Sequence, residues 1–430
     1  MLDRSSGPFL GRGGWIFHRI AASYWSLPVL AVLLAPLFAL ASILIDRAGL
    51  TPWILSADLS PVETSDTAKD LVGVAVGVNV ALATLYFSIA LLVLTVASSN
   101  LGVRLIDRWL NKRLVRASLS GLSSTLIFSL VALASIDAEA DLSDTPLATV
   151  ALVMALQTVN VAMLTVALHD LGRTIFVDRA IHNLGREASR GTIALAGAAP
   201  FEGSWATTVA APREGYIEGA DIERLRKYLR DHTGVVRVCA APGQHVLEGE
   251  PLIRLQHSFD RADRLTDAIS IGDFRSEGQG AVFQVRLLVE VAARALSPAV
   301  NDFYTAIAAC DRLTTAMLGQ TDLWIDDGKV PVYADETRIE LPGQDFRGLF
   351  DDPLDALRQA ACEYPSVSTR MIDNYARLIA ALPARCRSAD LRAFVTKKAR
   401  ELADHAADRA TAEIDRAAIR ERIARFDAAA

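Results

Sequence analysis

Residues 71–103 read LVGVAVGVNVALATLYFSIALLVLTVASSNLGV, a stretch without a single Asp, Glu, Lys or Arg. Three more uncharged stretches lie in the first 170 residues, at 20–45, 117–136 and 145–168. About 20 consecutive apolar residues suffice for a helix to cross the hydrocarbon core of a bilayer. The chain is therefore predicted to be an integral membrane protein whose four spans cover about 24–45, 71–98, 115–136 and 146–168.

The charged residues of the 430-residue chain concentrate after residue 170, although the mean hydropathy of the whole chain is +0.27. We therefore expect a membrane α-helical protein that also has a cytoplasmic α+β domain. Its predicted parts are a four-span transmembrane domain at 1–175, a β-rich module at 176–265 and a mainly helical region at 266–430. The formal net charge of −6 gives no indication of a nucleic-acid partner, so the bilayer is the partner that composition indicates.

The charges of the short connectors predict the orientation of the spans. Lys and Arg in such connectors mark the cytoplasmic side of a membrane. Basic residues dominate before the first span and between the second and third, and acidic residues dominate the other two connectors. We therefore expect a multi-pass membrane protein with a cytoplasmic N-terminus and C-terminus. The basic residues are Arg4, Arg12, Arg19, Arg104, Arg108, Lys112, Arg113 and Arg116; the acidic ones include Asp46, Asp58, Glu63, Asp66, Asp70, Asp137, Glu139, Asp141 and Asp144.

Three amide side chains interrupt the apolar spans. Asn79 lies in the second span, and Gln157 and Asn160 lie near the middle of the fourth. Amides in hydrocarbon need a partner or water. They predict either a polar pathway through a homo-oligomer or hydrogen bonds between helices. The second span also carries Gly73 and Gly77, a spacing that suits close helix contact.

A β-rich segment follows at about 205–255. Asp221 is the predicted N-cap of a short helix, and the run Gly243-x-x-Val246-x-x-Gly249-x-x-Leu252 resembles half of a barrel-sandwich hybrid, the biotinyl/lipoyl shape. The lysine that carries the prosthetic group in such domains is missing, because no Lys lies between Lys227 and Lys329. The segment is thus predicted to be a small β module without a cofactor.

The segment ALSPAVNDFYTA at 295–306 is predicted to form a corner between two helices. Ser297 before Pro298 is typical of a helix N-cap followed by a first-turn proline. The exposed N–H groups of a helix start can bind an anion. The segment therefore predicts either a site for a small ligand or anion, or a structural corner whose polar groups cap helices. The candidate ligand-binding residues are Arg294, Ser297, Asn301, Asp302, Tyr304 and Thr305.

The four spans, the β module and this A-L-S-P-x-x-N-D-x-x-T-A segment together resemble the bacterial predicted-membrane-protein family known as domain of unknown function 2254. The resemblance runs over roughly residues 10–385. Family members tend to have proline after the aspartate, where this chain has Phe303. The resemblance implies a location in the bacterial inner (plasma) membrane. Because the family has no assigned activity, the resemblance supports the architecture and transfers no catalytic residue.

The sequence contains no recognisable enzyme signature. None of the four cysteines forms a C-x-x-C pair or has a histidine at metal-ligand spacing, and no nucleotide-binding or hydrolase motif is present. We therefore expect no catalytic residue, metal or cofactor. The sequence favours a homo-oligomeric channel or passive transporter with a cytoplasmic regulatory domain. The alternative is a membrane-anchored scaffold or sensor whose cytoplasmic domain binds a partner or small ligand.

Overall fold

The computed structural model describes residues 25–101, 112–174, 177–190, 195–333, 338–382, 386 and 388–429. The chain divides into two compact units, Ile16–Phe176 and Val177–Ala430 together with Met1–Trp15. We call them the helical bundle and the C-terminal unit, and each is described by itself. The basic residues predicted before the first span, with Arg104 and Arg108, lie outside the described residues.

Four helices of the bundle are long and apolar enough to cross a membrane, as the sequence predicts. The first is interrupted at the π-helical turn η2, where Gly49 adopts a positive φ of 126° that an L side chain rarely adopts. The elements are α2 (Ser26–Ile45), η2 (Asp46–Leu50), α3 (Thr51–Ser56), α4 (Ser65–Leu101), α6 (Arg113–Ala134), η3 (Leu142–Asp144) and α7 (Leu147–Thr174).

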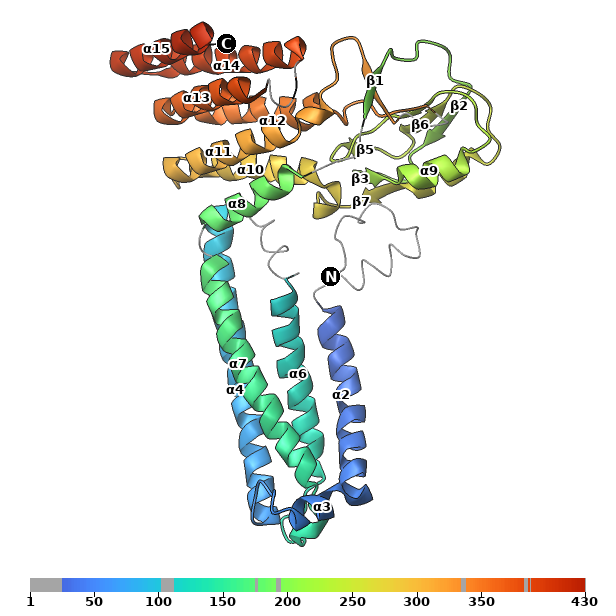
Figure 1. Ribbon diagram of the computed structural model, residues 1–430, viewed down its shortest axis with the longest axis vertical. Helices are drawn as coiled ribbons and strands as arrows, with labels where there is room; N and C mark the ends of the chain where they lie inside the picture. The colour runs from blue at the N-terminus through green and yellow to red at the C-terminus, as the bar shows by residue number, and fades with distance from the viewer. Residues whose placement is uncertain are drawn as a thin grey trace. The chain divides into compact units, whose positions relative to one another are not determined.

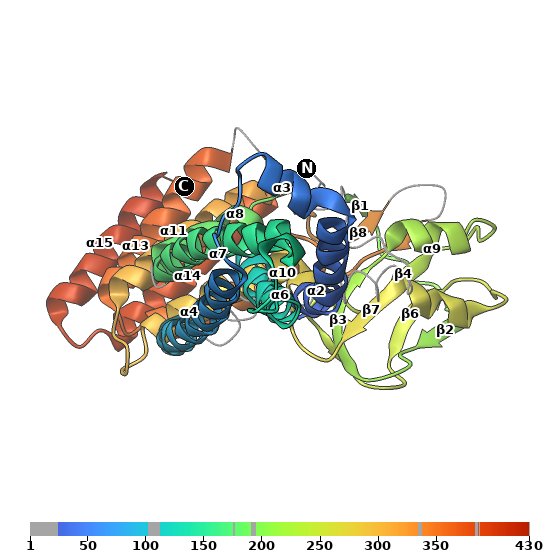
Figure 2. The same ribbon diagram turned by 90° about the horizontal axis from the view of Figure 1, so that it is seen from below.

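Helix α6 is the hub of the bundle, because it packs against α2, α4 and α7 (Figures 1 and 2). Its serines and Gly121 are small enough for close approach: a Cβ on Gly121 would lie 2.7 Å from Asn160 Oδ1. The outward faces of the other helices are apolar, with Leu33 and Leu91 each 66% exposed. This pattern of small residues inside and large apolar residues outside is the one that lipid-embedded helices require.

The C-terminal unit contains two sheets. One is mixed and six-stranded, in the order β1-β8-β9-β4-β6-β2, with β4 and β9 parallel; the other is antiparallel, in the order β5-β3-β7. β8 and β9 come from the region predicted to be mainly helical. The strands are β1 (Ala196–Ala198), β2 (Thr207–Ala210), β3 (Gly215–Ala220), β4 (Val236–Val238), β5 (His245–Val246), β6 (Pro251–Leu255), β7 (Ile269–Gly272), β8 (Val330–Tyr333) and β9 (Ile339–Glu340).

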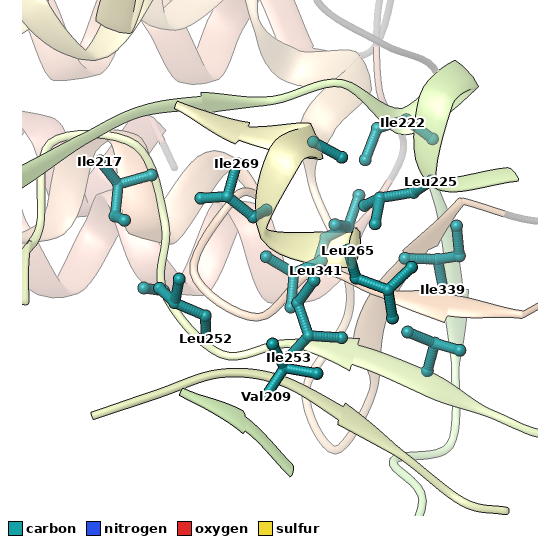
Figure 3. Packing of buried hydrophobic residues seen from close by; sticks show 14 of the residues in the cluster. Val209, Ile217, Ile222, Leu225, Leu252, Ile253, Leu265, Ile269, Ile339 and Leu341 are labelled. Atoms are coloured by element: carbon teal, nitrogen blue, oxygen red, sulfur yellow. The ribbon is translucent and has the colours of Figure 1, made fainter. Parts of the chain in front are cut away.

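One apolar core joins the two sheets. Side chains from both, such as Ile253 and Ile217, meet those of Leu225 on α9 and Leu265 on η4 (Figure 3). The N-cap predicted for α9 is present, since the Asp221 carboxylate accepts from Arg224 N at 2.9 Å. The unit thus has a mixed sheet and further helices, whereas the barrel-sandwich shape is not confirmed. The two elements are α9 (Ile222–Tyr228) and η4 (Ala262–Ala268).

The remaining helices of this unit stack in successive layers beside the sheets (Figure 1). α11 contacts α8, α10 and α13, and α13 in turn contacts α14 and α15. Their bounds are α8 (Val177–Ala188), η5 (Glu277–Gln279), α10 (Ala281–Ala295), α11 (Phe303–Gly319), η6 (Thr321–Leu323), α12 (Phe346–Ala361), α13 (Pro365–Ala381), α14 (Ala389–Arg409) and α15 (Glu413–Ala429).

Candidate functional site

Two of the three amides of the spans, Asn79 and Asn160, meet inside the bundle at one turn of α6. Asn79 Nδ2 donates to the carbonyl of Leu122 at 2.7 Å, and Asn160 Nδ2 donates to the carbonyl of Gly121 at 3.3 Å. Because these carbonyls belong to adjacent residues, α4 and α7 deliver their amides to α6 at the same depth. Gln157 lies one turn before Asn160 on α7, about 4.5 Å along the helix axis. We call Asn79, Gln157 and Asn160 the amide layer.

Gln157 differs from the two asparagines. Gln157 is 8% exposed, and neither Oε1 nor Nε2 of its side chain has a hydrogen-bond partner among the residues that the structure describes. Asn79 Oδ1 is likewise buried and unpartnered within that part of the chain. A buried polar atom without a partner costs about 1–3 kcal/mol in a protein interior. The layer therefore keeps hydrogen-bonding capacity that its own helices do not use.

Two apolar clusters enclose the amide layer. Toward the end of the bundle where α3 lies (Figure 1), α4, α6 and α7 contribute Ala75, Phe128 and Val153 to one cluster. One turn beyond the layer in the other direction, Leu82 and Leu164 belong to a second cluster, together with Leu122 itself. The layer is thus flanked on both sides by apolar packing.

These contacts indicate what the amides do in a single chain. Two of the three donate to the backbone of a neighbouring helix, which is the geometry expected of hydrogen bonds between membrane helices. All three side chains are neutral, so the layer can exchange hydrogen bonds with an uncharged group and cannot relay charge through a carboxylate or base. The polar pathway through an oligomer stays a prediction.

A buried carboxylate that the sequence places in a connector forms a second polar centre. Asp46 is 1% exposed. Its Oδ2 accepts from Thr149 N at 2.8 Å and from Thr149 Oγ1 at 2.7 Å, and its Oδ1 accepts from Ala148 N at 2.9 Å and from Thr51 Oγ1 at 3.1 Å. Asp46 thus caps the first turn of α7 from a different helix, where a negative charge is favourable.

Asp46 was missed as a buried residue because its position after an uncharged run is typical of a solvated connector. A local signal exists in hindsight. The residue before Leu147 at the start of α7 is Pro146, whose side chain has no acceptor for the first-turn N–H groups, so those groups need an acceptor from elsewhere. Thr145 is also engaged, since its Oγ1 lies 2.6 Å from Ser65 Oγ of α4.

The predicted corner exists, but it is built differently from the prediction. Ser297 does not cap a helix. Its carbonyl accepts from Val300 N at 3.0 Å and Asn301 N at 2.9 Å in a turn. The N-cap is Asp302, whose carboxylate accepts from Thr305 N at 3.1 Å and from Thr305 Oγ1 at 2.6 Å. The reason is that Asn301 adopts a left-handed φ of 50°, which delays the start of α11 until Phe303.

The predicted ligand-site residues come together only in part. Asp302 and Thr305 bond to each other, while Arg294 lies 4.0 Å from Glu290 of its own helix. At the start of α11, where an anion was predicted to bind, the N–H group of Thr305 already donates to the Asp302 carboxylate. What the corner displays is aromatic: Phe303 is 38% and Tyr304 is 74% exposed, with ring centroids 4.3 Å apart. Its anion-binding role stays a prediction.

One lysine of the C-terminal unit is buried among carboxylates. Lys398 Nζ lies 2.8 Å from Asp355 and 2.5 Å from Asp351, and only 7% of its side chain is exposed. Burial lowers the pKa of this ammonium group, but the hydrogen bonds to both carboxylates outweigh that effect and the net pKa is raised. Lys398 therefore stays protonated and joins α14 to α12; it does not serve as a base.

Four membrane-length helices and a C-terminal α+β unit define the class, a multi-span membrane protein with a large non-membrane part. The comparisons with known proteins agree. Residues 21–377 match the family described as Predicted membrane protein (DUF2254), and the chain belongs to that family.

The curated relatives are without assigned activity. "Uncharacterized protein MT1328" of Mycobacterium tuberculosis is 24% identical over 343 residues, and "Uncharacterized protein Mb1321c" of Mycobacterium bovis shows the same identity. The match covers 74% of this chain and 65% of each relative, so the chain spans less than two thirds of their length. No solved structure matches the chain.

Proposed function

We propose that the protein is a membrane-anchored scaffold or sensor of the bacterial inner membrane, with the C-terminal unit in the cytoplasm and no catalytic role. The observation that carries this proposal is the exposed aromatic corner of Phe303 and Tyr304. Aromatic side chains are enriched in the contact surfaces of proteins. The helical bundle then acts as the anchor, because Asp46, Asn79 and Asn160 each form hydrogen bonds that join its helices.

The corner is held rigidly enough to present these side chains. Asp302 N donates to the carbonyl of Ala295 at 2.7 Å, which closes the turn, and Tyr364 Oη donates to the carbonyl of Leu296 at 2.5 Å. A preformed surface loses little conformational entropy when a partner binds. The small β module, for which the barrel-sandwich shape remains part of the proposal, would be a second contact region.

A homo-oligomeric channel or passive transporter is the second candidate. It is favoured by the unused hydrogen-bonding atoms of Gln157 and Asn79 at the middle of the spans. Self-association has separate support in α4, where a Cβ at Gly73 or Gly77 would meet no atom within 4 Å. A close-packing glycine face that is open in one chain fits a second copy of the same chain.

Ion flux through liposomes separates the two candidates. We expect purified, folded protein to give no flux above that of protein-free liposomes, for several ions and pH values. Flux that is altered in rate or selectivity by Gln157→Leu combined with Asn160→Leu would replace the scaffold proposal by the channel. A matched control is Thr158→Leu, since Thr158 is exposed and its hydroxyl donates to the Met154 carbonyl of its own helix.

A photo-cross-linker tests the corner directly. With p-benzoylphenylalanine in place of Tyr304, irradiated native membranes should yield a discrete adduct. As a control, p-benzoylphenylalanine in place of Ile414, which is 79% exposed on α15, should not yield this adduct. Adducts that are absent, or identical at both positions, would contradict the proposed role of the corner.

The cytoplasmic location of the C-terminal unit is tested by labelling. A single added cysteine in the 137–144 connector should react with an impermeant thiol reagent from outside spheroplasts, whereas one placed at Ile414 should react only after lysis. The reverse pattern would invert the proposed orientation.

A further inference from the structure

The amide layer contains three buried polar atoms that have no hydrogen-bond partner within the described part of the chain: Gln157 Oε1, Gln157 Nε2 and Asn79 Oδ1. One more lies on each side of the layer, Ser129 Oγ toward the α3 end and Tyr86 Oη toward the other end. Elsewhere in the spans, exposed hydroxyls bond back to their own helix, as Thr84 does to Val80 at 2.9 Å and Ser88 to Thr84 at 2.8 Å. These exposed hydroxyls are thus satisfied, whereas the unpartnered atoms named above are buried.

A hydrogen-bond partner for these buried atoms has to be small and has to lie inside the helical bundle of one chain. Each of these atoms is buried by the chain's own helices, so neither a second subunit nor a lipid headgroup reaches it without opening the bundle. Apolar clusters enclose the layer on both sides. An acyl chain offers no hydrogen bonds, and buried polar groups in proteins are paired with protein or with ordered water.

The chemistry of the layer identifies the ligand class. It offers donors from Gln157 Nε2 and acceptors from Gln157 Oε1 and Asn79 Oδ1, with no charged side chain among the three amides. An ion would be stripped of its hydration without a counter-charge, which is costly. We propose that the amide layer binds water inside the helical bundle, bridging Gln157 of α7 to Asn79 of α4.

A methionine beside the layer makes the proposal measurable. A Cβ on Gly121 would lie 2.7 Å from Asn160 Oδ1 and 2.8 Å from Met163 Cε, so the Met163 methyl group lies against the turn of α6 to which Asn79 and Asn160 donate. Methionine is readily oxidised to the sulfoxide. Hydroxyl radicals produced from water by an X-ray pulse react close to where they form, so they oxidise side chains that contact bound water.

The experiment is radiolytic footprinting of the whole chain in lipid nanodiscs, read out by mass spectrometry. Met163 should be oxidised faster than Met154, which is 36% exposed on the lipid-facing side of the same helix. Met317 and Met371, which are only 0% and 1% exposed in the C-terminal unit, are the controls for a methionine in a dry core. Oxidation of Met163 no faster than that of Met154 overturns the proposal.

Gln157→Leu provides the second arm. It removes the side chain with the two unpartnered atoms, and should lower Met163 oxidation to the level of Met154 while Met317 and Met371 remain unchanged. An unaltered Met163 rate in the folded variant also overturns the proposal. If the variant does not fold, the comparison of Met163 with Met154 in the wild-type chain still decides the question.

Discussion

Asp46 illustrates how a single residue acquires its role from a distant partner. Its carboxylate follows the first span, yet it satisfies the N–H groups at the start of the fourth, about a hundred residues later in the chain. Four hydrogen bonds and the positive end of α7 compensate its buried charge. An amide at this position has the same size but presents an NH₂ group to donors.

We therefore expect Asp46→Asn to destabilise the bundle by roughly 2–3 kcal/mol, because hydrogen bonds to a charged group are lost and one donor faces another. The measurement is the thermal unfolding midpoint of the protein in detergent. The control is Asp58→Asn, at an exposed position of the same connector, which should leave the midpoint unchanged. Equal midpoints for wild type and Asp46→Asn would contradict the capping role.

Asp311 joins two helices of the C-terminal unit. Partial burial raises the pKa of this carboxyl, but hydrogen bonds from Arg370 and Asn374, at 2.8–2.9 Å, outweigh it and the net pKa lies below the ordinary value. A carboxyl whose pKa is lowered by folding stabilises the protein above its unfolded pKa of about 3.9. The contribution is lost as the pH falls through the folded pKa.

Asp311→Asn should cost about 1 kcal/mol at neutral pH, where the charge-assisted pair is intact. The difference between wild type and variant should shrink as the pH falls below about 4. Unfolding midpoints measured across this range test the sign, with Asp231→Asn in an exposed loop as the control. A difference that grows toward acid pH would show that the pairing with Arg370 is not its source.

At the scale of the element, helix starts and helix contacts depend on where the backbone of another segment passes. The first turn of α12 packs closely against the backbone at Gly343: a Cβ on Gly348 would lie 1.9 Å from the Gly343 carbonyl oxygen. Asp345 caps the same turn by accepting from Gly348 N at 3.1 Å. The glycine is needed for this close approach, since neither backbone segment can give way as a side chain would.

Gly348→Ala is accordingly expected to destabilise the C-terminal unit by about 3 kcal/mol through forced backbone displacement. Limited proteolysis and the unfolding midpoint would report the loss. Gly219→Ala on β3 is the matched substitution, because its Cβ would meet no atom within 4 Å. Similar behaviour of the two variants would mean that the α12 start tolerates the shift.

At the scale of the whole molecule, one face of α4 predicts how two copies of the chain associate. Gly73, Gly77 and Ala81 follow one another at every fourth residue, and Thr84 and Ser88 continue the same small-residue stripe, all at least partly exposed. In lipid, such faces allow helix backbones to approach closely, and van der Waals packing then drives association.

Gly73→Leu combined with Gly77→Leu should reduce self-association in nanodiscs without changing the stability of the single chain. Chemical cross-linking or energy transfer between labelled copies provides the measurement. Val74→Leu with Val78→Leu is the control pair, at neighbouring positions that are 64% and 40% exposed. A wild-type chain that is monomeric, or a glycine variant that associates like wild type, would rule out this contact.

The sequence by itself determined the four spans, because the length and apolarity of a helix that crosses a membrane are local properties of the chain. It also predicted the Asp221 cap of α9, in which residues close in sequence bond to each other. Tertiary structure alone decided that Asp46 is buried, that Asn79 and Asn160 meet at one turn of α6, and that β9 pairs with β4. It also moved the helix start at the corner from Ser297 to Asp302. Each of these features depends on a distant contact or on a backbone conformation. Local sequence patterns do not predict either one, because both result from packing across the whole chain.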